Sequence, residues 1–119
     1  MLVCLNVNMM RECLFCKIIK REIPSDIVYE TDKVIVFKDI HPKAKFHLLI
    51  LPKKHIISVN HLKKEERELM GELILTAQKI AKENKLKGYK LIINVGRQGG
   101  QLIDHLHLHL LSGKEIELP

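Results

Sequence analysis

Three histidines alternate with two leucines near the end of the chain, in the order His105-Leu106-His107-Leu108-His109. In an extended strand alternate side chains share one face, which would place the imidazoles in a row about 6.6 Å apart and the leucines in the core. An unperturbed imidazole has a pKa of about 6.5, so much of it is neutral and nucleophilic at neutral pH. We therefore expect chemistry here rather than a plain surface strand. A zinc site built from two or three of these rings is the alternative.

A glycine-rich segment, Gly96-Arg97-Gln98-Gly99-Gly100-Gln101, comes shortly before the histidines. Its glycines would let backbone N–H groups approach and hold a phosphate. Next to a row of histidines, the segment favours a reaction at phosphorus. In that reaction the central His107 would be the nucleophile, and its neighbours would donate hydrogen bonds to the phosphate oxygens.

A second group of candidate residues lies near the start of the chain, where Cys13 and Cys16 have the spacing of a zinc knuckle. The chain has three cysteines, including Cys4, and an odd number favours a metal or redox role over a structural disulfide in a reducing compartment. One such pair is weak, because two cysteines on one helical face can also be core residues. The residues alone leave both readings open.

The hydrophobic pattern predicts two helices and five strands to position these residues. In chain order they are a short helix over Cys13–Lys20, a hairpin of Ile27–Tyr29 and Val34–Phe37, a strand over Phe46–Leu51, a long amphipathic helix from Leu62 to Ala81 that stops by Gly88, a buried strand over Tyr89–Val95, a flexible loop over Gly96–Gln101 and a last strand over Leu102–Leu111. Helices and strands do not alternate, so we expect an α+β fold: a five-stranded antiparallel sheet with one short N-terminal helix and one long helix.

The length of 119 residues fits a single domain, which we place at residues 13–119. Residues 1–12 would be a leader, disordered or mis-started, since Met9-Met10 offers another start. The chain contains no apolar stretch of membrane-spanning length and no signal-peptide pattern, so we expect a cytoplasmic protein that does not enter a membrane.

The net charge of +6 favours anionic ligands such as phosphates. The basic residues are scattered, and the aromatic content is only 4% with no Trp, which leaves few platforms for stacking bases. A nucleic-acid partner is therefore not expected.

Several segments together resemble the histidine triad (HIT) superfamily, and within it the Hint branch of nucleoside phosphoramidases. The resemblance is carried by the histidine run His105–Leu111 after Gly99-Gly100-Gln101, and by Phe15–Pro24, Phe37–Ile40, His47–His55 and Gly88–Asn94, in the same order and spacing. It covers the chain from about Cys13 to its end. It implies a HIT-like fold and a homodimer, the latter also favoured by the apolar residues of the predicted strand Tyr89–Val95 and the long helix.

The resemblance also implies an activity: binding a purine nucleotide and cleaving a bond at its α-phosphate, typically P–N, through a nucleotidyl-histidine intermediate. His107 would be the nucleophile, while His109 and His47 would bracket the phosphate. The implied substrate contacts are Asp39 for the ribose hydroxyls, an apolar slot of Leu14, Phe15, Ile18, Phe37 and Ile40 for the base, and Asn94, Gly100, Gln101 and Leu102 for the phosphate or leaving group.

In zinc-containing members of the superfamily, two cysteines and two histidines occupy matching positions. The resemblance thus implies a closed structural zinc site of Cys13, Cys16, His55 and His105. His41 and His61 match no motif, and we expect them on the surface.

The sequence departs from the family pattern in two places. Leu102 stands where many relatives carry Ser, so a hydroxyl that could assist the leaving group is absent, and the chain ends Glu117-Leu118-Pro119 where relatives often have a Trp-Pro segment. Two alternatives stay open. Leu102 and the basic charge favour a zinc-stabilised nucleotide-binding or interaction module with little turnover. The other alternative is a dinucleoside polyphosphate hydrolase of a sister branch, against which His109 argues because that branch more often has Gln at or near this position.

Overall fold

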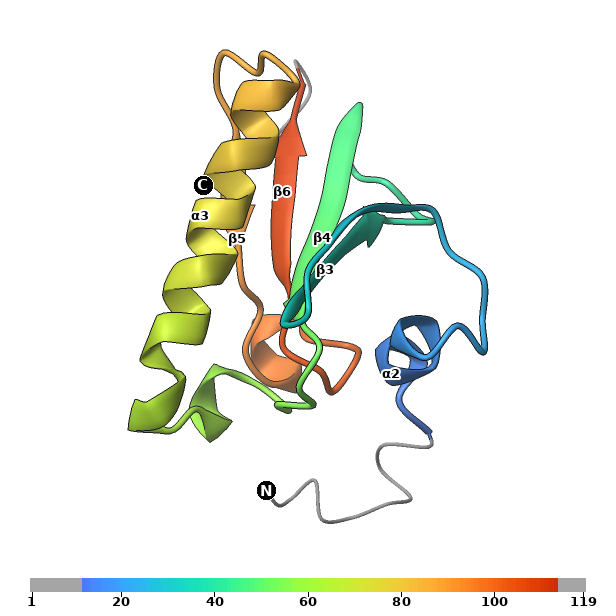
Figure 1. The fold of residues 1–119 in the computed structure, drawn as a ribbon, viewed down its shortest axis with the longest axis vertical. Coiled ribbons are helices and arrows are strands. Elements are labelled where there is room, and N and C mark those ends of the chain that lie inside the picture. The colour runs from blue at the N-terminus through green and yellow to red at the C-terminus, as the bar shows by residue number, and fades with distance from the viewer. Residues whose placement is uncertain (1–11, 114–119) are drawn as a thin grey trace.

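An antiparallel sheet of five strands forms the centre of the molecule in the computed structural model, which describes residues 12–113 (Figure 1). The spatial order of the strands is β2-β3-β4-β6-β5. Their bounds are Ile27–Glu30 for β2, Val34–Lys38 for β3, Phe46–Pro52 for β4, Lys90–Ile92 for β5 and Leu108–Ser112 for β6. Strand β6 pairs with β4 on one side and β5 on the other, so residues far apart in sequence meet on adjacent strands.

Among residues 12–113, two α-helices accompany the sheet, a short one, α2, over Leu14–Ile19 and a long one, α3, over Arg67–Glu83. Three 3-10 turns lie at Val59–His61, Lys64–Glu66 and Arg97–Gly99. This arrangement confirms the predicted α+β fold class. None of the helices among the described residues is long and apolar enough to cross a membrane.

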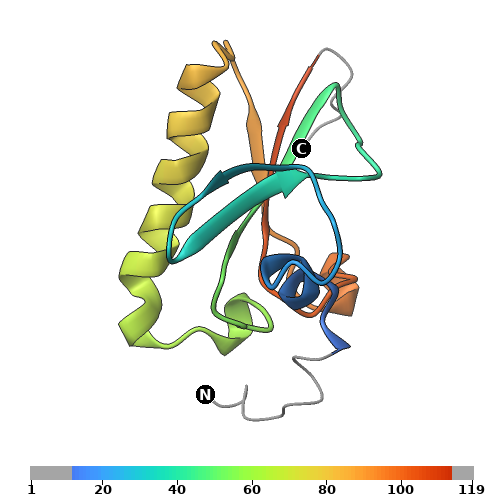
Figure 2. The same cartoon turned by 45° about the vertical axis from the view of Figure 1, so that its right-hand side comes forward.

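The two helices cover opposite faces of the sheet, as Figures 1 and 2 show together. Leu73, Ala77 and Ile80 of α3 are buried at helical spacing and pack against one face. Phe15, Cys16 and Ile18 of α2 are buried against the other. The sheet residues under α2 are Ile35, Phe37, Leu49 and Leu51, all from β3 and β4. Because α2 has only six residues, it covers the β3–β4 part of its face.

The long helix begins later than predicted and ends two residues beyond Ala81, the last residue of the predicted apolar pattern. It begins at Arg67 rather than Leu62, because Glu66 accepts the backbone N–H of Lys63 at 2.8 Å and closes a separate 3-10 turn. It ends at Glu83, before Gly88, because the Asn84 side chain donates to the Ile80 carbonyl at 2.8 Å and the next residue, Lys85, has a positive φ of 55°.

The last strand also differs from the prediction, since it pairs only over Leu108–Ser112 rather than from Leu102. The preceding residues form other contacts. His105 donates its backbone N–H to the Ile103 carbonyl at 2.9 Å, and Leu106 donates to the Ile56 carbonyl at 2.7 Å. Strand β5 is likewise shorter than the predicted Tyr89–Val95. Residues 1–11 of the leader, which is predicted over residues 1–12, lie outside the described residues, as do residues 114–119.

Candidate active site

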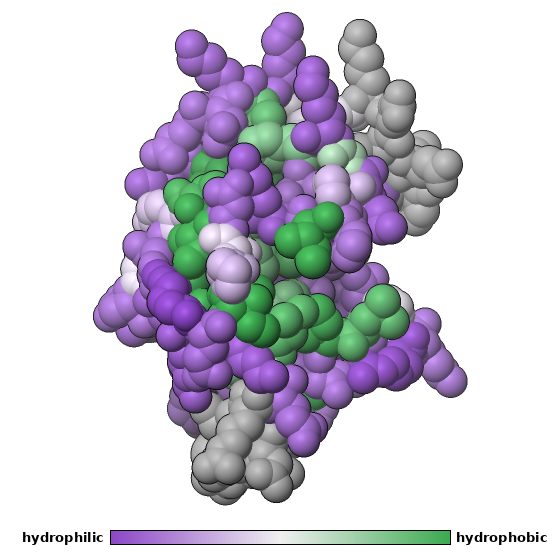
Figure 3. All heavy atoms as spheres, turned by 90° about the vertical axis from the view of Figure 1, so that its right-hand side faces the viewer, coloured by the Kyte–Doolittle hydropathy of each residue, from purple (hydrophilic) through white to green (hydrophobic). Residues whose placement is uncertain are grey.

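A cavity of about 920 Å³ opens on the face of the sheet that α2 leaves partly uncovered. Figure 3 looks toward the α2 side of the molecule and shows apolar side chains gathered at the middle of that surface. One end of the cavity is apolar, lined by Leu14, Phe15, Ile18, Phe37, Leu49 and Ile103. The middle is polar, lined by Asp39, His47, Asn94, His107 and His109. The strands thus join an apolar slot to a group of histidines.

His107 has its proton position fixed by the backbone. Its Nδ1 lies 2.7 Å from the carbonyl oxygen of His105, and because a carbonyl can only accept, Nδ1 carries the proton. In the neutral ring Nε2 then keeps a lone pair. Burial lowers the pKa of His107, which favours this neutral form. Phe15 packs edge-on against the ring with centroids 5.0 Å apart, so His107 is both oriented and available as a nucleophile.

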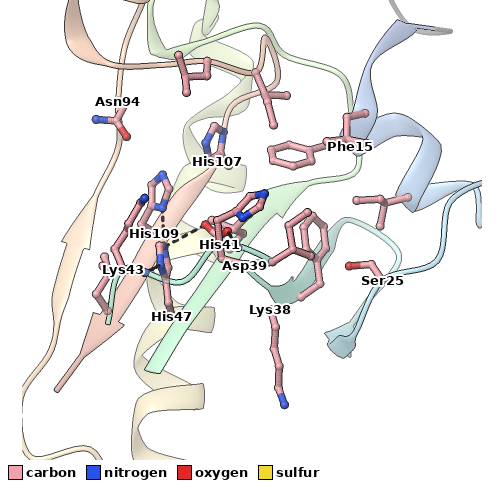
Figure 4. Close-up of a pocket in the computed structure, with 18 of the residues that line it drawn as sticks. Phe15, Ser25, Lys38, Asp39, His41, Lys43, His47, Asn94, His107 and His109 are labelled. Carbon is pink, nitrogen blue, oxygen red and sulfur yellow. Dashed lines mark hydrogen bonds and ion pairs between the residues drawn. The ribbon is translucent and has the colours of Figure 1, made fainter. Parts of the chain in front are cut away.

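A chain of hydrogen bonds fixes the other two histidines (Figure 4). The backbone N–H of Lys43 donates to Nδ1 of His47 at 3.0 Å, so the proton of His47 is on Nε2. That Nε2 lies 2.9 Å from Nδ1 of His109 and 3.4 Å from a carboxylate oxygen of Asp39. Since Nδ1 of His109 accepts, its own proton is on Nε2. His109 can therefore donate a hydrogen bond while remaining neutral.

The charge state of His109 follows from its surroundings. Burial, and then the neighbouring His107 and His47, lower the pKa of His109 to about 4. Burial is also the main cause that lowers the pKa of His47, opposed by the carboxylate of Asp39. At neutral pH the three rings are uncharged, so the site combines the lone pair on Nε2 of His107 with the N–H groups of His47 and His109. This combination suits attack on phosphorus and stabilisation of its oxygens.

Asp39 follows β3 directly and is only partly exposed. Its Oδ1 accepts the backbone N–H of His41 at 2.8 Å, which orients the carboxylate. A carboxylate oxygen has two lone pairs, so Asp39 can accept further hydrogen bonds from a pair of hydroxyls. The next residue, Ile40, also lines the cavity and is 77% exposed.

The glycine-rich loop beside the histidines contains a short 3-10 turn. Arg97–Gly99 forms a 3-10 turn, and Gly96 and Gly100 have positive φ angles of 72° and 88°, which glycine adopts without strain. A side chain at Gly100 would also meet the Asn94 amide, whose Nδ2 would lie 3.4 Å from the added carbon. Asn94 in turn donates to the Gly99 carbonyl at 2.9 Å. The loop and Asn94 therefore form one unit at the edge of the cavity.

Gln101 holds this loop in place from behind. It is 1% exposed, and its side chain accepts the Gly96 N–H at 2.9 Å and donates to the carbonyls of Ile57 at 2.7 Å and Ile103 at 3.0 Å. The side chain does not line the cavity, whereas Gly100 and the 80% exposed Leu102 do. The structure thus gives Gln101 a positioning role, and its expected contact with a substrate stays a prediction.

A second, fully buried cluster brings together Cys13, Cys16, His55 and His105, whose possible ligand atoms all lie within 4.8 Å of one another. Nδ1 of His105 is 3.4 Å from the sulfur of Cys13 and 3.2 Å from Nδ1 of His55, and the sulfur of Cys16 is also 3.2 Å from Nδ1 of His55. The ligands of a tetrahedral zinc ion are about 3.3–3.8 Å apart. The spacing and the donor atoms therefore fit such an ion.

The protonation of this cluster also suits a metal. His105 donates its Nε2 proton to the Pro52 carbonyl at 2.8 Å, which leaves Nδ1 as the ligand atom. The pKa of the Cys13 thiol is lowered to about 3, mainly by a hydrogen bond from Cys16, so this thiol is ionised at neutral pH. With four protein donors the cluster has no open position for a substrate.

The predicted row of three histidines is therefore divided. His105 points into the cysteine cluster, while His107 and His109 line the cavity with ring centroids 5.0 Å apart. The alternative zinc site made from two or three of the row is not assembled, although Asp39, His47 and His109 form another close group of possible ligands.

Several cavity residues were missed by sequence reasoning. His41, expected on the surface, is exposed but lines the cavity, whereas His61 is exposed and contacts Ser58 outside it. Ile23, Pro24, Ser25, Lys38, Lys43, Lys90, Ile92 and Leu111 also line the cavity. Lys90 and Ile92 could have been found from the sequence, because alternate residues of a strand share a face and both alternate with Asn94, which was predicted in the site.

Comparisons with known proteins agree on one family. Residues 12–117 match the family described as scavenger mRNA decapping enzyme C-term binding. A purine nucleoside phosphoramidase of Escherichia coli K12 is 46% identical over 110 residues, covering 91% of this chain and 92% of that protein. A HIT-like protein of Synechococcus elongatus is 44% identical over 112 residues, covering 93% and 98%. A HIT family hydrolase of Legionella pneumophila superposes with a TM-score of 0.87 at 44% identity, covering 91% and 98%.

Proposed function

This chain belongs to the histidine triad (HIT) family and is a nucleotide hydrolase, and from that premise we propose which bond it cleaves. The substrates are purine nucleoside 5'-phosphoramidates or related derivatives at the α-phosphate, cleaved through a nucleotidyl-histidine intermediate. The observation that carries the proposal is the 2.7 Å contact of His107 Nδ1 with a carbonyl, which leaves Nε2 unprotonated in the cavity. The purine nucleoside phosphoramidase of Escherichia coli, at 46% identity, supports the same reaction.

In the proposed reaction the lone pair on Nε2 of His107 forms a bond to phosphorus. The P–N bond breaks, and the departing amine nitrogen keeps the electron pair and takes up a proton from solvent. Water then attacks phosphorus and loses a proton to solvent, and the bond between phosphorus and Nε2 breaks. This releases the nucleoside monophosphate and returns His107 to its starting state. The Nε2 proton of His109 is placed to stabilise the phosphate oxygens, with His47 holding that ring through its 2.9 Å contact.

The remaining cavity residues would bind the nucleotide. The apolar slot of Leu14, Phe15, Ile18, Phe37 and Ile40 takes the base, and Asp39 accepts hydrogen bonds from the ribose hydroxyls. Asn94, Gly100 and Leu102 lie where they can contact the phosphate or the leaving group. The slot is supported by the edge-on contact of Phe15 with Phe37, whose ring centroids are 5.5 Å apart.

The direct test is incubation with a fluorogenic adenosine 5'-phosphoramidate, following amine release and isolating an acid-labile nucleotidyl-protein adduct. We expect turnover together with the adduct. Binding of AMP without turnover would instead support the nucleotide-binding module. A higher specificity constant for dinucleoside polyphosphates than for phosphoramidates would support the third function. Leu102, which has no hydroxyl to assist a departing amine, is the residue that keeps the nucleotide-binding module open as an alternative.

The cysteine cluster would hold one structural zinc ion, with Cys13, Cys16, His55 and His105 as ligands. Zinc accepts thiolates and imidazoles together in closed tetrahedral sites, and the burial of all four residues supports this assignment. The ion would connect α2 to the segment before β6. Its contribution would be to stability, because the catalytic histidines lie in the cavity and not in the cluster.

We also propose that the chain forms a homodimer. Strand β5 lies at an edge of the sheet, and Ile74, Leu75 and Tyr89 are exposed apolar or aromatic side chains on α3 and next to β5. A twofold interface would bury this surface symmetrically. Sedimentation at micromolar concentration should then give about twice the chain mass of 13.8 kDa. A mass of one chain would contradict the proposal. The expected cytoplasmic location stays a prediction.

A further inference from the structure

We infer that the leaving group of the preferred substrate carries a negative charge, which Lys43 contacts. The inference rests on the proposed function, and it concerns the end of the cavity away from the apolar slot. The cavity changes in character across the sheet. Its apolar slot lies under α2 against β3 and β4, while the wall at β5 presents Lys90 and Ile92 of that strand and then Asn94, which follows it. Lys90 is opposite Leu111 in the β5–β6 pairing and Ile92 is opposite His109, so both share the face of the catalytic histidines.

Lys43 lies at this second end. It belongs to the segment between β3 and β4, and its backbone N–H holds His47. In Figure 4 its side chain lies on the same side of the histidines as Asn94, and Phe15 lies on the other side. A nucleotide whose base fills the slot next to Phe15 and whose phosphate reaches His107 therefore leaves the Lys43 end for the group that departs.

The charges around the cavity are unequal. Asp39 is the only carboxylate among the described lining residues. It already accepts the backbone N–H of His41 and lies 3.4 Å from Nε2 of His47. Three lysines line the cavity, but Lys38 forms an ion pair with Asp26 at 3.3 Å. Figure 4 shows Lys38 directed away from the histidines. Within residues 12–113 no carboxylate forms an ion pair with Lys43.

The positive charge of Lys43 also reaches the catalytic group, because it contributes to lowering the pKa of His47. A substrate whose only negative charge is on the α-phosphate would place no negative charge next to Lys43. A carboxylate or a further phosphate on the leaving group would complete the match and would avoid placing a neutral or cationic group beside the lysine.

The test compares the adenosine 5'-phosphoramidates of β-alanine and β-alaninamide, which differ only in a carboxylate against a carboxamide. We expect the wild-type protein to have a specificity constant about three- to fivefold higher for the carboxylate, the effect of one exposed ion pair. The preference should shrink as salt is added. Lys43→Gln should reduce the ratio of the two specificity constants to near one, and Lys43→Arg should retain it. Lys38→Gln is the matched control and should keep the wild-type ratio.

Equal specificity constants for the two substrates in the wild-type protein would overturn the inference. So would an equal loss for both substrates in Lys43→Gln, since the lysine would then serve the common phosphate. Binding of the same pair to His107→Ala, measured by calorimetry, gives the affinity ratio without turnover. If neither compound is hydrolysed, the proposed reaction fails. The calorimetric ratio in His107→Ala, with and without Lys43→Gln, then decides the inference separately.

Discussion

Replacing His107 by alanine is expected to reduce turnover of an adenosine phosphoramidate to background, a loss of at least about 10³-fold. The change removes Nε2 of His107. Its lone pair is available because the proton of this ring is on Nδ1, which lies 2.7 Å from the His105 carbonyl oxygen. AMP binding should change by less than about tenfold, because a nucleophile makes few of the ground-state contacts. The measurement is steady-state kinetics with calorimetric AMP binding on the same preparation.

Two kinds of variant control this experiment. His109→Ala and His47→Ala should lower the rate by about 10²–10³, the range for one lost donor to a developing charge. His61→Ala is a matched histidine control, since His61 is exposed and contacts Ser58 rather than the cavity. Retention of more than about one-tenth of wild-type activity by His107→Ala would refute the assignment of the nucleophile.

The sequence predicts the elements of this fold well because their patterns are local. The period of apolar residues along α3 and the β-branched runs of β3 and β4 each reflect one buried face, and these elements are confirmed. Their ends are less predictable because single side-chain contacts decide them. The Glu66 side chain accepts the Lys63 N–H, and the Asn84 side chain donates to the Ile80 carbonyl. These contacts set the two ends of α3, and neither contact changes the hydrophobic pattern.

The candidate site, too, was predictable from the sequence only in part. Strict alternation predicts that His105, His107 and His109 share a face, but alternation holds only while the backbone remains a strand. Pairing begins at Leu108, and the segment before it instead bonds to Ile56 and directs His105 into the cysteine cluster. The four cluster residues are separated by up to 92 positions, so no spacing rule brings them together. Residue type and family resemblance named them, and tertiary packing places them.

Some of the cavity residues that sequence reasoning missed are of types that are common on protein surfaces. Lys43 and His41 occupy a connection between strands, where charged residues are ordinary, and only the strand order shows that this connection borders the histidines. Gln101 is the opposite case. A polar residue beside two glycines suggests contact with a ligand. The three hydrogen bonds of the Gln101 side chain, however, are all to backbone groups of the protein.

Removing the proposed metal is the change expected to affect stability most. Chelation, or the double variant Cys13→Ser and Cys16→Ser, should lower the melting temperature by about 10 °C or more. A structural zinc ion is worth several kcal/mol, and about 1 kcal/mol shifts a domain of this size by several degrees. The four cluster residues are buried, and they connect α2 with the segment before His107. Without the ion, only the contacts among these four side chains and their neighbours would hold the two parts together. Scanning calorimetry with and without added zinc measures the effect.

Activity should fall less than stability in protein that remains folded, because the closed Cys2His2 set offers no position to a substrate. Elemental analysis of protein purified without chelators should show about one zinc ion per chain, and the double variant should have lost it. Cys4→Ser, which changes a cysteine that is not one of the four proposed ligands, serves as the control. An unchanged melting temperature when zinc is added to metal-free wild-type protein would contradict the assignment. Cys13 and Cys16 would then be core residues that hold α2 to the sheet by packing alone.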